Sequence, residues 1–484
     1  MEKFVGAIDQ GTTGTRFMVF DYEGNVVDQA YEEHQQIYPK PGWVEHDPNE
    51  IIRRTRSVVE RCQRSLDRRF KEWEIVGVGI TNQRETTVAW NRRTGEPLYN
   101  AIVWQDTRTK DICNMFPEGL VRERTGLVVS TYFSATKIKW LLDNVIKSKE
   151  DVIFGTIDSW LIWSLTKEHV TDYTNASRTM LMDIKKLEWD GELLELCGVD
   201  ENMLPEIKSS SEIYGFFEMG GQEVPICGAL GDQQAALFGQ ACYEKGEAKN
   251  TFGTGNFLLM NTGRDATFSD SGLLTTVAYG VEGKRVNYAL EGSIAVTGAA
   301  VQWLRDNLGI IKTADETQIL GNVDNGGVYF VPAFSGLFAP YWDMSARGSI
   351  LGLTRFVRKE QIVRAVLESE CYQSRDVIEA MEKDCGFPIK DIRVDGGATK
   401  NSLLMQLFAD ISGNKVIRPK VSETTALGAA YAAGLAQGYW EDTNELKEKW
   451  KEDISFEPSI SEEKRNELYR WWKKAVEKSK GWLE

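Results

Sequence analysis

Each half of this chain contains the same short unit: a strand, a turn rich in glycine and threonine, and a second strand. In the first half, residues 4–8 (FVGAI) and 15–20 (TRFMVF) predict strands on either side of the turn at 9–14 (DQGTTG). In the second half, residues 249–260 (KNTFGTGNFLLM) predict strand, glycine turn and strand again. A chain of 484 residues also exceeds the roughly 250–300 residues that one hydrophobic core supports. The repeated unit therefore indicates two similarly built α/β domains.

The remaining periodic segments fit a boundary near residue 245, with domains at 1–245 and 246–484. We expect a helix at 49–70, strands at 75–80 (IVGVGI), 226–231 (ICGALG) and 392–397 (IRVDGG), a short helix at 233–241, and a helix of small residues at 424–436. The charged tail at 444–484 is expected to be helical. Leu468, Trp471 and Ala475 have helical spacing and would dock it on the body.

The overall charge argues against nucleic acid and membrane partners. Lys+Arg total 57 and Asp+Glu total 72, which gives a formal net charge of −15. A chain this acidic gains nothing from long-range attraction to phosphate backbones or anionic lipid surfaces. No apolar run reaches the roughly 18 residues that suggest a membrane span. We therefore expect neither a nucleic-acid partner nor an integral membrane span.

Histidine and cysteine usage narrows the chemistry. The three histidines, His34, His46 and His169, show no zinc-binding spacing, which disfavours zinc hydrolases, and so few histidines also disfavour serine triads. The seven cysteines are scattered, without a CxxC pair, which is typical of reduced, buried thiols. The N-terminus has no signal-peptide pattern. We expect a cytoplasmic protein.

The first turn, Asp9 to Arg16, has the composition of a phosphate cradle. Its glycines let backbone N–H groups turn inward, and its threonines add hydroxyl donors. An aspartate at a strand end can hold Mg²⁺ through water. A hairpin with polar turn residues is the alternative. The second turn, at 252–256 (FGTGN), is weaker evidence, because it lacks the third glycine of a dinucleotide fingerprint, and no P-loop sequence occurs.

Taken together, these features resemble the actin–hexokinase–heat-shock chaperone ATPase superfamily. The shared features are the two glycine turns, the VDGG turn at 394–397 and two helices of small residues, in this order. The resemblance implies two ribonuclease H-like domains that face each other across a nucleotide cleft. ATP phosphates would meet the first turn, and VDGG would lie near adenosine.

Two further segments, 132–144 (YFSATKIKWLLDN) and 348–368 (GSILGLTRFVRKEQIVRAVLE), fit the pattern of FGGY carbohydrate kinases. Within that family, six segments resemble the glycerol kinases: 38–48 (YPKPGWVEHDP), 79–87 (GITNQRETT), 99–109 (YNAIVWQDTRT), 171–180 (TDYTNASRTM), 231–240 (GDQQAALFGQ) and 288–293 (YALEGS). The resemblance spans residues 4 to 482. It implies ATP-dependent phosphorylation of glycerol to sn-glycerol 3-phosphate, and a homodimer or homotetramer.

The resemblance also implies a polyol site. Arg84, Glu85 and Tyr132 would hydrogen-bond the hydroxyls, Trp104 and Phe257 would pack against the carbons, and Gln233 would lie beside the substrate. Asp232 would be the general base, because a carboxylate within reach can accept the proton of the attacking alcohol. From the residues alone, Arg84 and Glu85 could be a surface salt bridge, the two aromatic rings ordinary core, and Asp232 the N-cap of the helix at 233.

On the nucleotide side, the resemblance implies a set drawn from both halves: Thr12, Thr13, Gly14, Arg16, Thr254, Gly298, Gln302, Gly397 and Asn401, with Asp9 positioning Mg²⁺. Two residues depart from the family pattern. Many glycerol kinases have Ser at the position of Gly14, so only a backbone N–H donor remains there. Cys or Ser is common at the position of Asn256.

Two other functions stay open. One is a kinase for another polyol or sugar, although xylulose kinases usually lack the NQRE run at 82–85. The other is a nucleotide-gated binding protein that uses the same fold without phosphoryl transfer. Asp9, Arg84, Glu85 and Asp232 argue against that second alternative.

Overall fold

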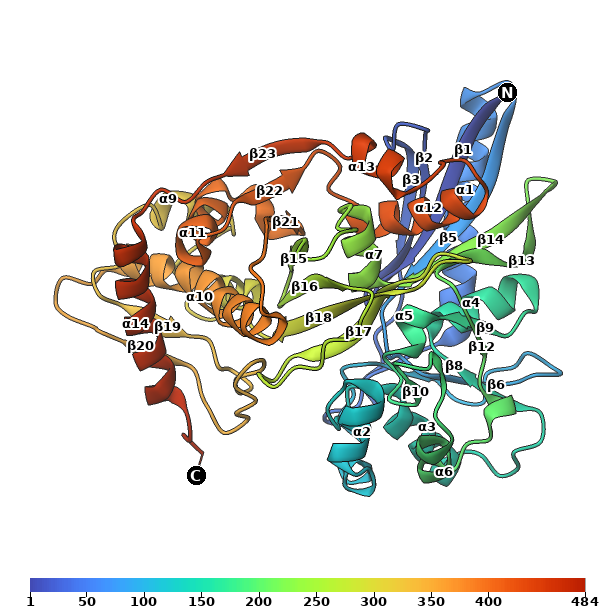
Figure 1. Ribbon diagram of the computed structural model, residues 1–484, viewed down its shortest axis with the longest axis horizontal. Coiled ribbons are helices and arrows are strands. Elements are labelled where there is room, and N and C mark those ends of the chain that lie inside the picture. The colour runs from blue at the N-terminus through green and yellow to red at the C-terminus, as the bar shows by residue number, and fades with distance from the viewer. Residues whose placement is uncertain (484) are drawn as a thin grey trace.

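The computed structural model describes residues 1–483 and contains two large β-sheets side by side (Figure 1). The first sheet has six strands in the order β13-β14-β5-β1-β2-β3. Strands β1, β2 and β3 form an antiparallel meander, and β5 and β14 run parallel to β1. The strands are β1 (Glu2–Gln10), β2 (Gly14–Phe20), β3 (Val26–Glu33), β5 (Trp73–Asn82), β13 (Ser211–Met219) and β14 (Gln222–Gly231).

The second sheet repeats this arrangement. Its seven strands have the order β17-β18-β16-β15-β21-β22-β23, with β18, β16 and β15 antiparallel and β21 and β22 parallel to β15. They are β15 (Ala248–Phe252), β16 (Asn256–Gly263), β17 (Leu274–Tyr279), β18 (Asn287–Ile294), β21 (Ile392–Asp395), β22 (Val416–Pro419) and β23 (Glu452–Phe456). The same five-strand unit therefore occurs twice. The two glycine turns predicted the strand–turn–strand part of it, which is β1 and β2 in the first sheet and β15 and β16 in the second.

Two helices cross each other between the sheets. These are α7 (Asp232–Gly239), which follows β14, and α12 (Thr424–Ala436), which comes from the second half (Figure 1). α12 nonetheless packs on β5, β14 and β1 of the first sheet. A Cβ on Gly428 would overlap the carbonyl oxygen of Ala235 in α7, so the helix backbones touch. The small residues at 424–436 serve the close packing that the sequence predicted.

Longer helices cover the sheets. The amphipathic α1 (Pro48–Arg69) packs against β2 and β3, and Asp47 caps its N-terminus. The 27-residue α10 (Lys359–Cys385) lies in the core of the second half and contacts β16 and β18. The other elements are β4 (Glu45–His46), β6 (Val88–Asn91), β7 (Ala101–Ile102), α2 (Glu118–Thr125), α3 (Ser134–Asn144), β8 (Val152–Gly155), α4 (Ile157–Thr166), β9 (Val170–Asp172), α5 (Tyr173–Ala176), β10 (Met182–Asp183), β11 (Glu188–Trp189), α6 (Gly191–Cys197), β12 (Glu206–Lys208), α8 (Gly298–Asp306), α9 (Glu316–Leu320), β19 (Tyr329–Val331), β20 (Ser349–Leu351), α11 (Ser402–Ser412), α13 (Thr443–Lys449) and α14 (Glu462–Ser479).

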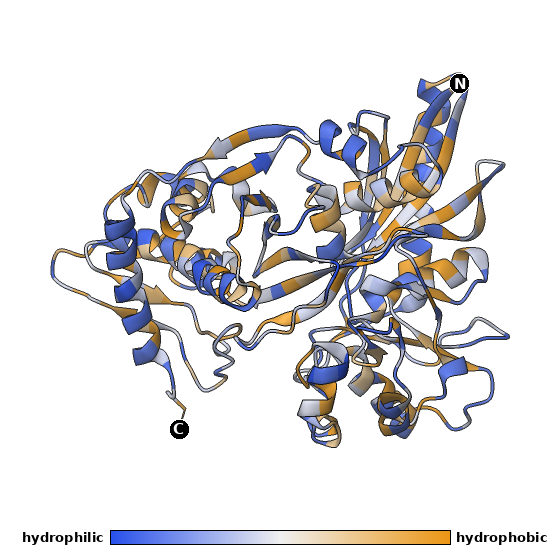
Figure 2. Ribbon diagram, viewed as in Figure 1, coloured by the Kyte–Doolittle hydropathy of each residue, from blue (hydrophilic) through white to orange (hydrophobic). Residues whose placement is uncertain are grey.

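The tail is only partly as expected. It is not helical throughout, because β23 lies between α13 and α14 and adds an edge strand to the second sheet. The docking face of α14 is also shifted: Trp472 is fully buried, whereas Trp471 is 47% exposed. Asp376 of α10 explains the shift, because it accepts hydrogen bonds from the Tyr469 hydroxyl (2.6 Å) and from Trp472 Nε1 (2.9 Å). Figure 2 shows the rest of α14 as mainly hydrophilic.

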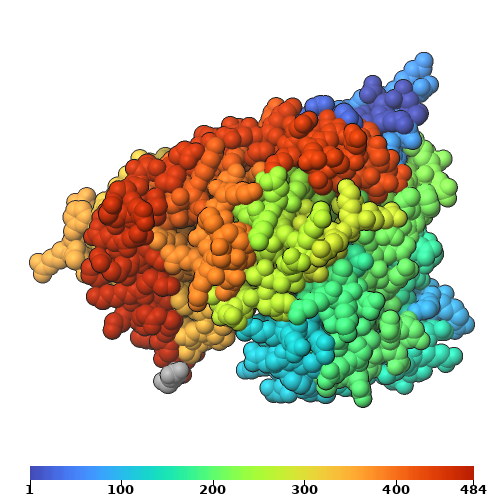
Figure 3. Space-filling model, viewed as in Figure 1, coloured from blue at the N-terminus to red at the C-terminus, as the bar shows by residue number. Residues whose placement is uncertain are grey.

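The segment between α12 and β23 lies over the N-terminal strands. Trp440 Nε1 donates to the carbonyl of Tyr22 (2.9 Å), and Lys449 pairs with Glu23 (3.3 Å). In Figure 3 these orange-red atoms adjoin the blue N-terminal ones. No helix within residues 1–483 is both long and apolar enough to cross a membrane.

Candidate functional site

The carboxyl ends of three neighbouring strands bring the predicted polar residues together. Asp9 is near the end of β1, Arg84 and Glu85 follow β5, and Asp232 follows β14. The strands run parallel in the order β14-β5-β1, so their ends lie along one sheet edge. Glu85 has a positive φ of 61°, a strained conformation for a residue with a side chain. Such strain is typical of functional sites.

Arg84 is held by a carboxylate from the second sheet. Its guanidinium bonds both oxygens of Glu291 of β18, at 2.5 and 3.0 Å, and Nη1 also donates to Gln234 (3.1 Å). Its Nε lies 3.2 Å from Asp232 Oδ1. Arg84 is 3% exposed and Glu291 is fully buried. The alternative of a surface salt bridge between Arg84 and Glu85 is wrong, because both side chains are buried.

Arg178 extends this array to Glu85. Its Nε donates to Glu85 Oε1 (2.7 Å) and its Nη2 to Glu291 Oε1 (3.1 Å). The charges therefore alternate in the order Asp232, Arg84, Glu291, Arg178, Glu85, and all but Asp232 are buried. Burial raises the pKa of Glu291, but Arg178 and Arg84 outweigh it and lower that pKa to about 2. Because positive and negative side chains alternate, each buried charge has a partner that offsets the cost of removing it from water.

Arg178 and Glu291 are functional residues without a predicted role. Both lie in segments quoted for the family resemblance, 171–180 and 288–293. The available signal was a charged residue inside a run of small or apolar residues, most clearly in YALEGS. Such a charge is either paired or functional when buried.

Asp232 begins α7 rather than capping it. Gly231 occupies the cap position, and the Asp232 carboxylate accepts a hydrogen bond from the backbone N–H of Gln233 (2.8 Å). The side chain remains 32% exposed. Desolvation raises the pKa of Asp232, whereas Arg84 and Lys249 oppose the rise. An accessible carboxylate at this place can accept a proton from a substrate hydroxyl.

Lys249 of β15 is a second buried cation that the sequence analysis missed. Its ammonium donates to the Gln233 side-chain oxygen, to Thr251 Oγ1 (2.8 Å) and to the Phe257 carbonyl (3.3 Å). Burial lowers the pKa of Lys249 to about 8, although Asp395, Glu291 and Asp232 oppose the shift. Lys249 thus fixes Gln233 beside Asp232 and places positive charge between the two sheets.

The predicted aromatic residues border the charged array. The Trp104 and Tyr132 rings meet edge to face with centroids 5.6 Å apart, and the Arg84 guanidinium lies 5.9 Å from the centre of the Phe257 ring. Buried Lys137 donates to the carbonyls of Thr131 (2.8 Å) and Tyr132 (2.7 Å), which fixes the turn that carries Tyr132. All three rings are partly exposed, and Phe257 and Tyr132 also pack against the hydrophobic core.

The first glycine turn lies next to this array. Trp104 Nε1 donates to Thr12 Oγ1 (3.0 Å), and Thr13 is exposed. Arg16 points to Glu423, which precedes α12, and forms an ion pair with it. Burial raises the pKa of Asp9 to about 7; Arg16 opposes the shift, and the carboxylates of Asp232 and Glu423 add to it. A divalent cation would relieve that crowding of acidic groups, so the residues fit Mg²⁺.

The second-half residues gather at the ends of β15 and β21. A Cβ on Gly298 would overlap the carbonyl of Gly253, and Ala299 N donates to the carbonyl of Thr254 (3.1 Å). Gln302 is exposed one turn later on α8. Asn256 is buried, and its side chain accepts a hydrogen bond from Thr297 (2.8 Å), which fixes the start of α8.

The last two predicted nucleotide residues follow β21. Gly397 is exposed, and a Cβ there would meet nothing within 4 Å, which leaves room for a ligand. Asn401 caps α11 by accepting from Leu404 N (3.1 Å), and its amide donates to Thr317 (3.0 Å). Asn401 therefore has a structural role in addition to any contact with a ligand.

Sequence comparison places this geometry in a family. The pattern of the N-terminal domain of the FGGY family of carbohydrate kinases matches residues 4–239, and that of the C-terminal domain matches residues 248–437. The chain belongs to the FGGY family of carbohydrate kinases. Its fold is the two-domain, mixed α/β fold of the actin–hexokinase type that the sequence predicted.

Relatives of this FGGY kinase carry narrower names. It is 58% identical to a glycerol kinase of Petrotoga mobilis over the full length of both chains. The structure of Plasmodium falciparum glycerol kinase with ADP superposes with a TM-score of 0.95 at 39% identity, covering 99% of this chain and 98% of that one. A ligand-bound xylulose kinase of Lactobacillus acidophilus has a TM-score of 0.90 over 100% of both chains, at 23% identity, and shows the fold alone.

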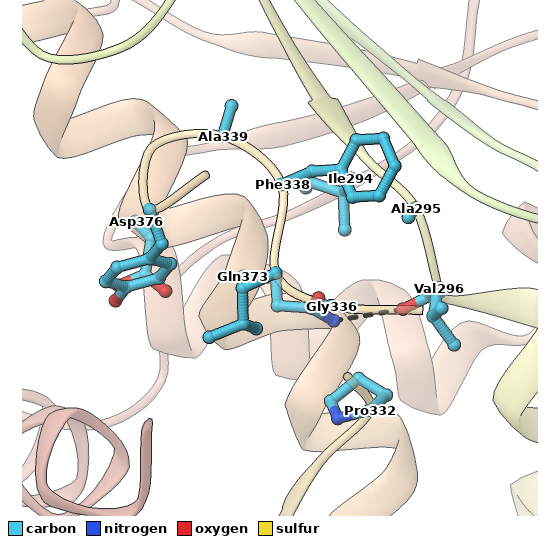
Figure 4. A pocket seen from close by; sticks show the side chains of 11 residues that line it. Ile294, Ala295, Val296, Pro332, Gly336, Phe338, Ala339, Gln373 and Asp376 are labelled. Carbon is cyan, nitrogen blue, oxygen red and sulfur yellow. Dashed lines mark hydrogen bonds between the residues drawn. The ribbon is translucent and has the colours of Figure 1, made fainter. Parts of the chain in front are cut away.

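The enclosed cavity of this FGGY kinase is not its candidate site. It lies between α10 and the loop after β18, where Gln373 donates to the carbonyl of Val296 (3.1 Å) (Figure 4). The cavity has room for about one water molecule. Within residues 1–483, no group of three or more His, Cys, Asp or Glu side chains could hold a metal ion. Asp9 alone therefore fits Mg²⁺ only as part of a shell completed by water and phosphate.

Proposed function

We propose that this FGGY kinase transfers the γ-phosphoryl group of ATP to glycerol and forms sn-glycerol 3-phosphate. The observation that carries the proposal is the convergence of Arg84, Glu85 and Asp232 on one sheet edge, next to aromatic rings. Glycerol needs hydrogen-bonding groups for three hydroxyls and an apolar wall for its carbons. The relatives named glycerol kinase, up to 58% identical over the full length, support the same substrate.

Each polar residue has a distinct task in this proposal. Arg84 donates to one hydroxyl, the Glu85 carboxylate accepts from another, and Tyr132 contacts a third. Trp104 and Phe257 pack against the carbons, and Gln233, held by Lys249, borders the reacting hydroxyl. A substrate that lacks a hydroxyl would leave buried polar groups unpaired, so the site would reject it strongly.

Asp232 acts as the general base. The terminal hydroxyl attacks the γ-phosphorus, its proton passes to the Asp232 carboxylate, and ADP leaves in line with the new P–O bond. Arg84 (3.2 Å from Asp232) holds the carboxylate in place. Closure of the two domains would exclude water, which competes as a nucleophile.

ATP would lie between the two glycine turns. Thr12, Thr13, Gly14 and Arg16 would bind its phosphates from the first domain, and Thr254, Gly298, Gln302, Gly397 and Asn401 would bind from the second. Asp9 would hold Mg²⁺ through water. The ion supplies positive charge that offsets the developing negative charge on the transferred group.

Three further statements belong to this proposal. We place the domain boundary near residue 245, which the sheets support: every strand of the first sheet ends by Gly231, and every strand of the second begins at or after Ala248. We place the protein in the cytoplasm, where its seven free cysteines would stay reduced. We expect a homodimer or homotetramer, which light scattering after gel filtration would measure.

A coupled ADP-release assay with MgATP, with and without glycerol, followed by product identification, tests the reaction. We expect glycerol-dependent ADP release and glycerol 3-phosphate as the product. A higher kcat/KM for a pentulose than for glycerol would favour another sugar kinase. If no acceptor yields ADP while ATP still binds, the protein is a nucleotide-gated binding protein.

Asp232→Asn tests the base. We expect kcat to fall by about 10³-fold or more while glycerol still binds, because the amide cannot accept the proton. Asp270→Asn is the matched control, since the Asp270 side chain is fully exposed. Near-normal turnover of Asp232→Asn would remove Asp232 as the base and leave the overall reaction intact.

A further inference from the structure

The space beside Gly14 is filled by Tyr31 of β3. A Cβ built on Gly14 would lie 2.6 Å from the Tyr31 hydroxyl oxygen and 2.6 Å from the carbonyl oxygen of Glu32. Tyr31 and the backbone of Glu32 together exclude a side chain at position 14. The departure from the family pattern at Gly14 is therefore coupled to a residue 17 positions further along the chain.

Tyr31 contacts the predicted phosphate-binding residues on both sides of Gly14. In the β2–β3 pairing it lies directly opposite Arg16, and the Arg16 guanidinium is 5.7 Å from the centre of its ring. Its hydroxyl is 3.5 Å from Thr13 Oγ1. Tyr31 as a whole is 42% exposed. Its phenol borders Thr13, Gly14 and Arg16, the residues predicted to bind phosphate.

We propose that Tyr31 binds a phosphate of the nucleoside triphosphate and supplies the side-chain hydroxyl that Gly14 cannot provide. The Tyr31 ring also positions Arg16, because the Arg16 guanidinium lies over the face of the ring in a cation–π contact. The proposal rests on the proposed function, because it places the phosphates at the first glycine turn. It adds a nucleotide-binding residue on β3, outside the turn itself.

Tyr31→Phe tests the hydroxyl while keeping the ring. A hydrogen bond to a charged group contributes enough that its loss weakens binding about tenfold or more. We expect kcat/KM for MgATP to fall about tenfold, the Kd of a non-hydrolysable ATP analogue to rise by a similar factor, and KM for glycerol to stay within twofold. Tyr38→Phe, at an exposed tyrosine of the same half, is the control.

Substitutions at both Gly14 and Tyr31 test whether the two positions are coupled by steric contact. Gly14→Ser alone should weaken analogue binding, because the new side chain meets Tyr31. Gly14→Ser combined with Tyr31→Ala should bind the analogue better than Gly14→Ser alone, because the clash with the Tyr31 ring is gone and only the Glu32 carbonyl oxygen still has to move. Thermal unfolding of each variant shows whether it is folded.

Two results would overturn the proposal: an analogue Kd for Tyr31→Phe within twofold of wild type, or additive losses in the double variant. Neither depends on which acceptor the enzyme uses. If wild-type protein binds the analogue but does not phosphorylate glycerol, the proposed function fails while the Tyr31 measurement still stands.

Discussion

At the scale of single residues, buried charges are the main feature of the proposed site. Arg84, Glu291 and Arg178 are buried and pair with one another, and only Arg178 Nη1 among the guanidinium nitrogens of the two arginines lacks a partner within residues 1–483. Glu370, in the middle of α10, is the opposite case. It is 1% exposed, and neither of its carboxyl oxygens has a hydrogen-bond partner among residues 1–483. Burial alone raises the pKa of Glu370 to about 8.

Glu370 makes the stability of the protein pH-dependent. Its pKa rises from 4.5 in the unfolded chain to about 8 in the folded one, so the folded state binds the proton more tightly. The contribution of this proton to the free energy of unfolding is fully present below about pH 4.5 and is lost as the pH rises through about 8. Glu370→Gln removes this titration. The free energy of unfolding of Glu370→Gln, relative to that of wild type, should therefore increase with pH by up to about 1.4 kcal/mol per pH unit between pH 5 and 8.

Unfolding midpoints of wild type and Glu370→Gln at pH 5.5 and pH 8 measure this effect. Glu60→Gln, at an exposed glutamate of α1, is the control and should show no such difference between the two pH values. An equal shift for Glu370→Gln at both pH values would mean that Glu370 is already ionised in the folded protein.

The hydrophobic pattern predicts that Arg84, Glu85 and Asp232 follow strand ends, and the family resemblance gives them candidate roles. The residues that hold them in place were not predicted. Glu291, the main partner of Arg84, lies 207 residues away on the other sheet. The run YALEGS marks Glu291 as a buried charge but does not identify its partner, because that partner is fixed only when the two sheets come together.

At the scale of elements, the sequence predicted where α14 is helical but not which of its faces packs against the protein. Leu468, Trp471 and Ala475 have helical spacing, but so do Tyr469, Trp472 and Val476, and the second set is the more buried one. Adjacent tryptophans give two faces about 100° apart with similar hydrophobicity. Asp376 decides between them by hydrogen bonding to Tyr469 and Trp472.

The two tryptophans of α14 form a matched pair for mutation. Trp472→Ala should lower the free energy of unfolding by about 3–5 kcal/mol, because it leaves a cavity and an unpaired Asp376 oxygen. Trp471→Ala should change it by about 0.5 kcal/mol or less. Denaturant unfolding measures both. Equal losses at the two positions would mean that α14 docks through a broader face.

At the scale of the whole molecule, the crossing of α7 and α12 links the proposed base to both sheets. Asp232 and Gln233 begin α7, and α7 touches α12 through Ala235 and Gly428. The repeated strand–turn–strand unit was predictable from the two glycine turns. That α12 would cover the sheet of the other half was not, because helix amphipathicity does not say which sheet is the partner.

Gly428→Ala tests this link. The added methyl group would overlap the Ala235 carbonyl, so α7 must move. We expect a loss of about 1–3 kcal/mol in stability from overpacking and a fall in kcat of about tenfold or more, since small displacements of catalytic groups are costly.

Gly119→Ala is the control for Gly428→Ala, because Gly119 is also helical and a Cβ there meets nothing within 4 Å. It should leave kcat unchanged and slightly stabilise α2. Unchanged kcat in Gly428→Ala would show that the crossing has no influence on the position of Asp232.

The position of α12 also has a consequence for biosynthesis. The ribosome completes every strand of the first sheet by Gly231, but the helix that covers β1, β5 and β14 spans Thr424–Ala436. Until that segment emerges, one apolar face of an otherwise finished sheet is exposed to solvent. This apolar face of the first sheet therefore stays exposed while nearly all of the second sheet is synthesised. We expect chaperones to bind the nascent chain during this interval.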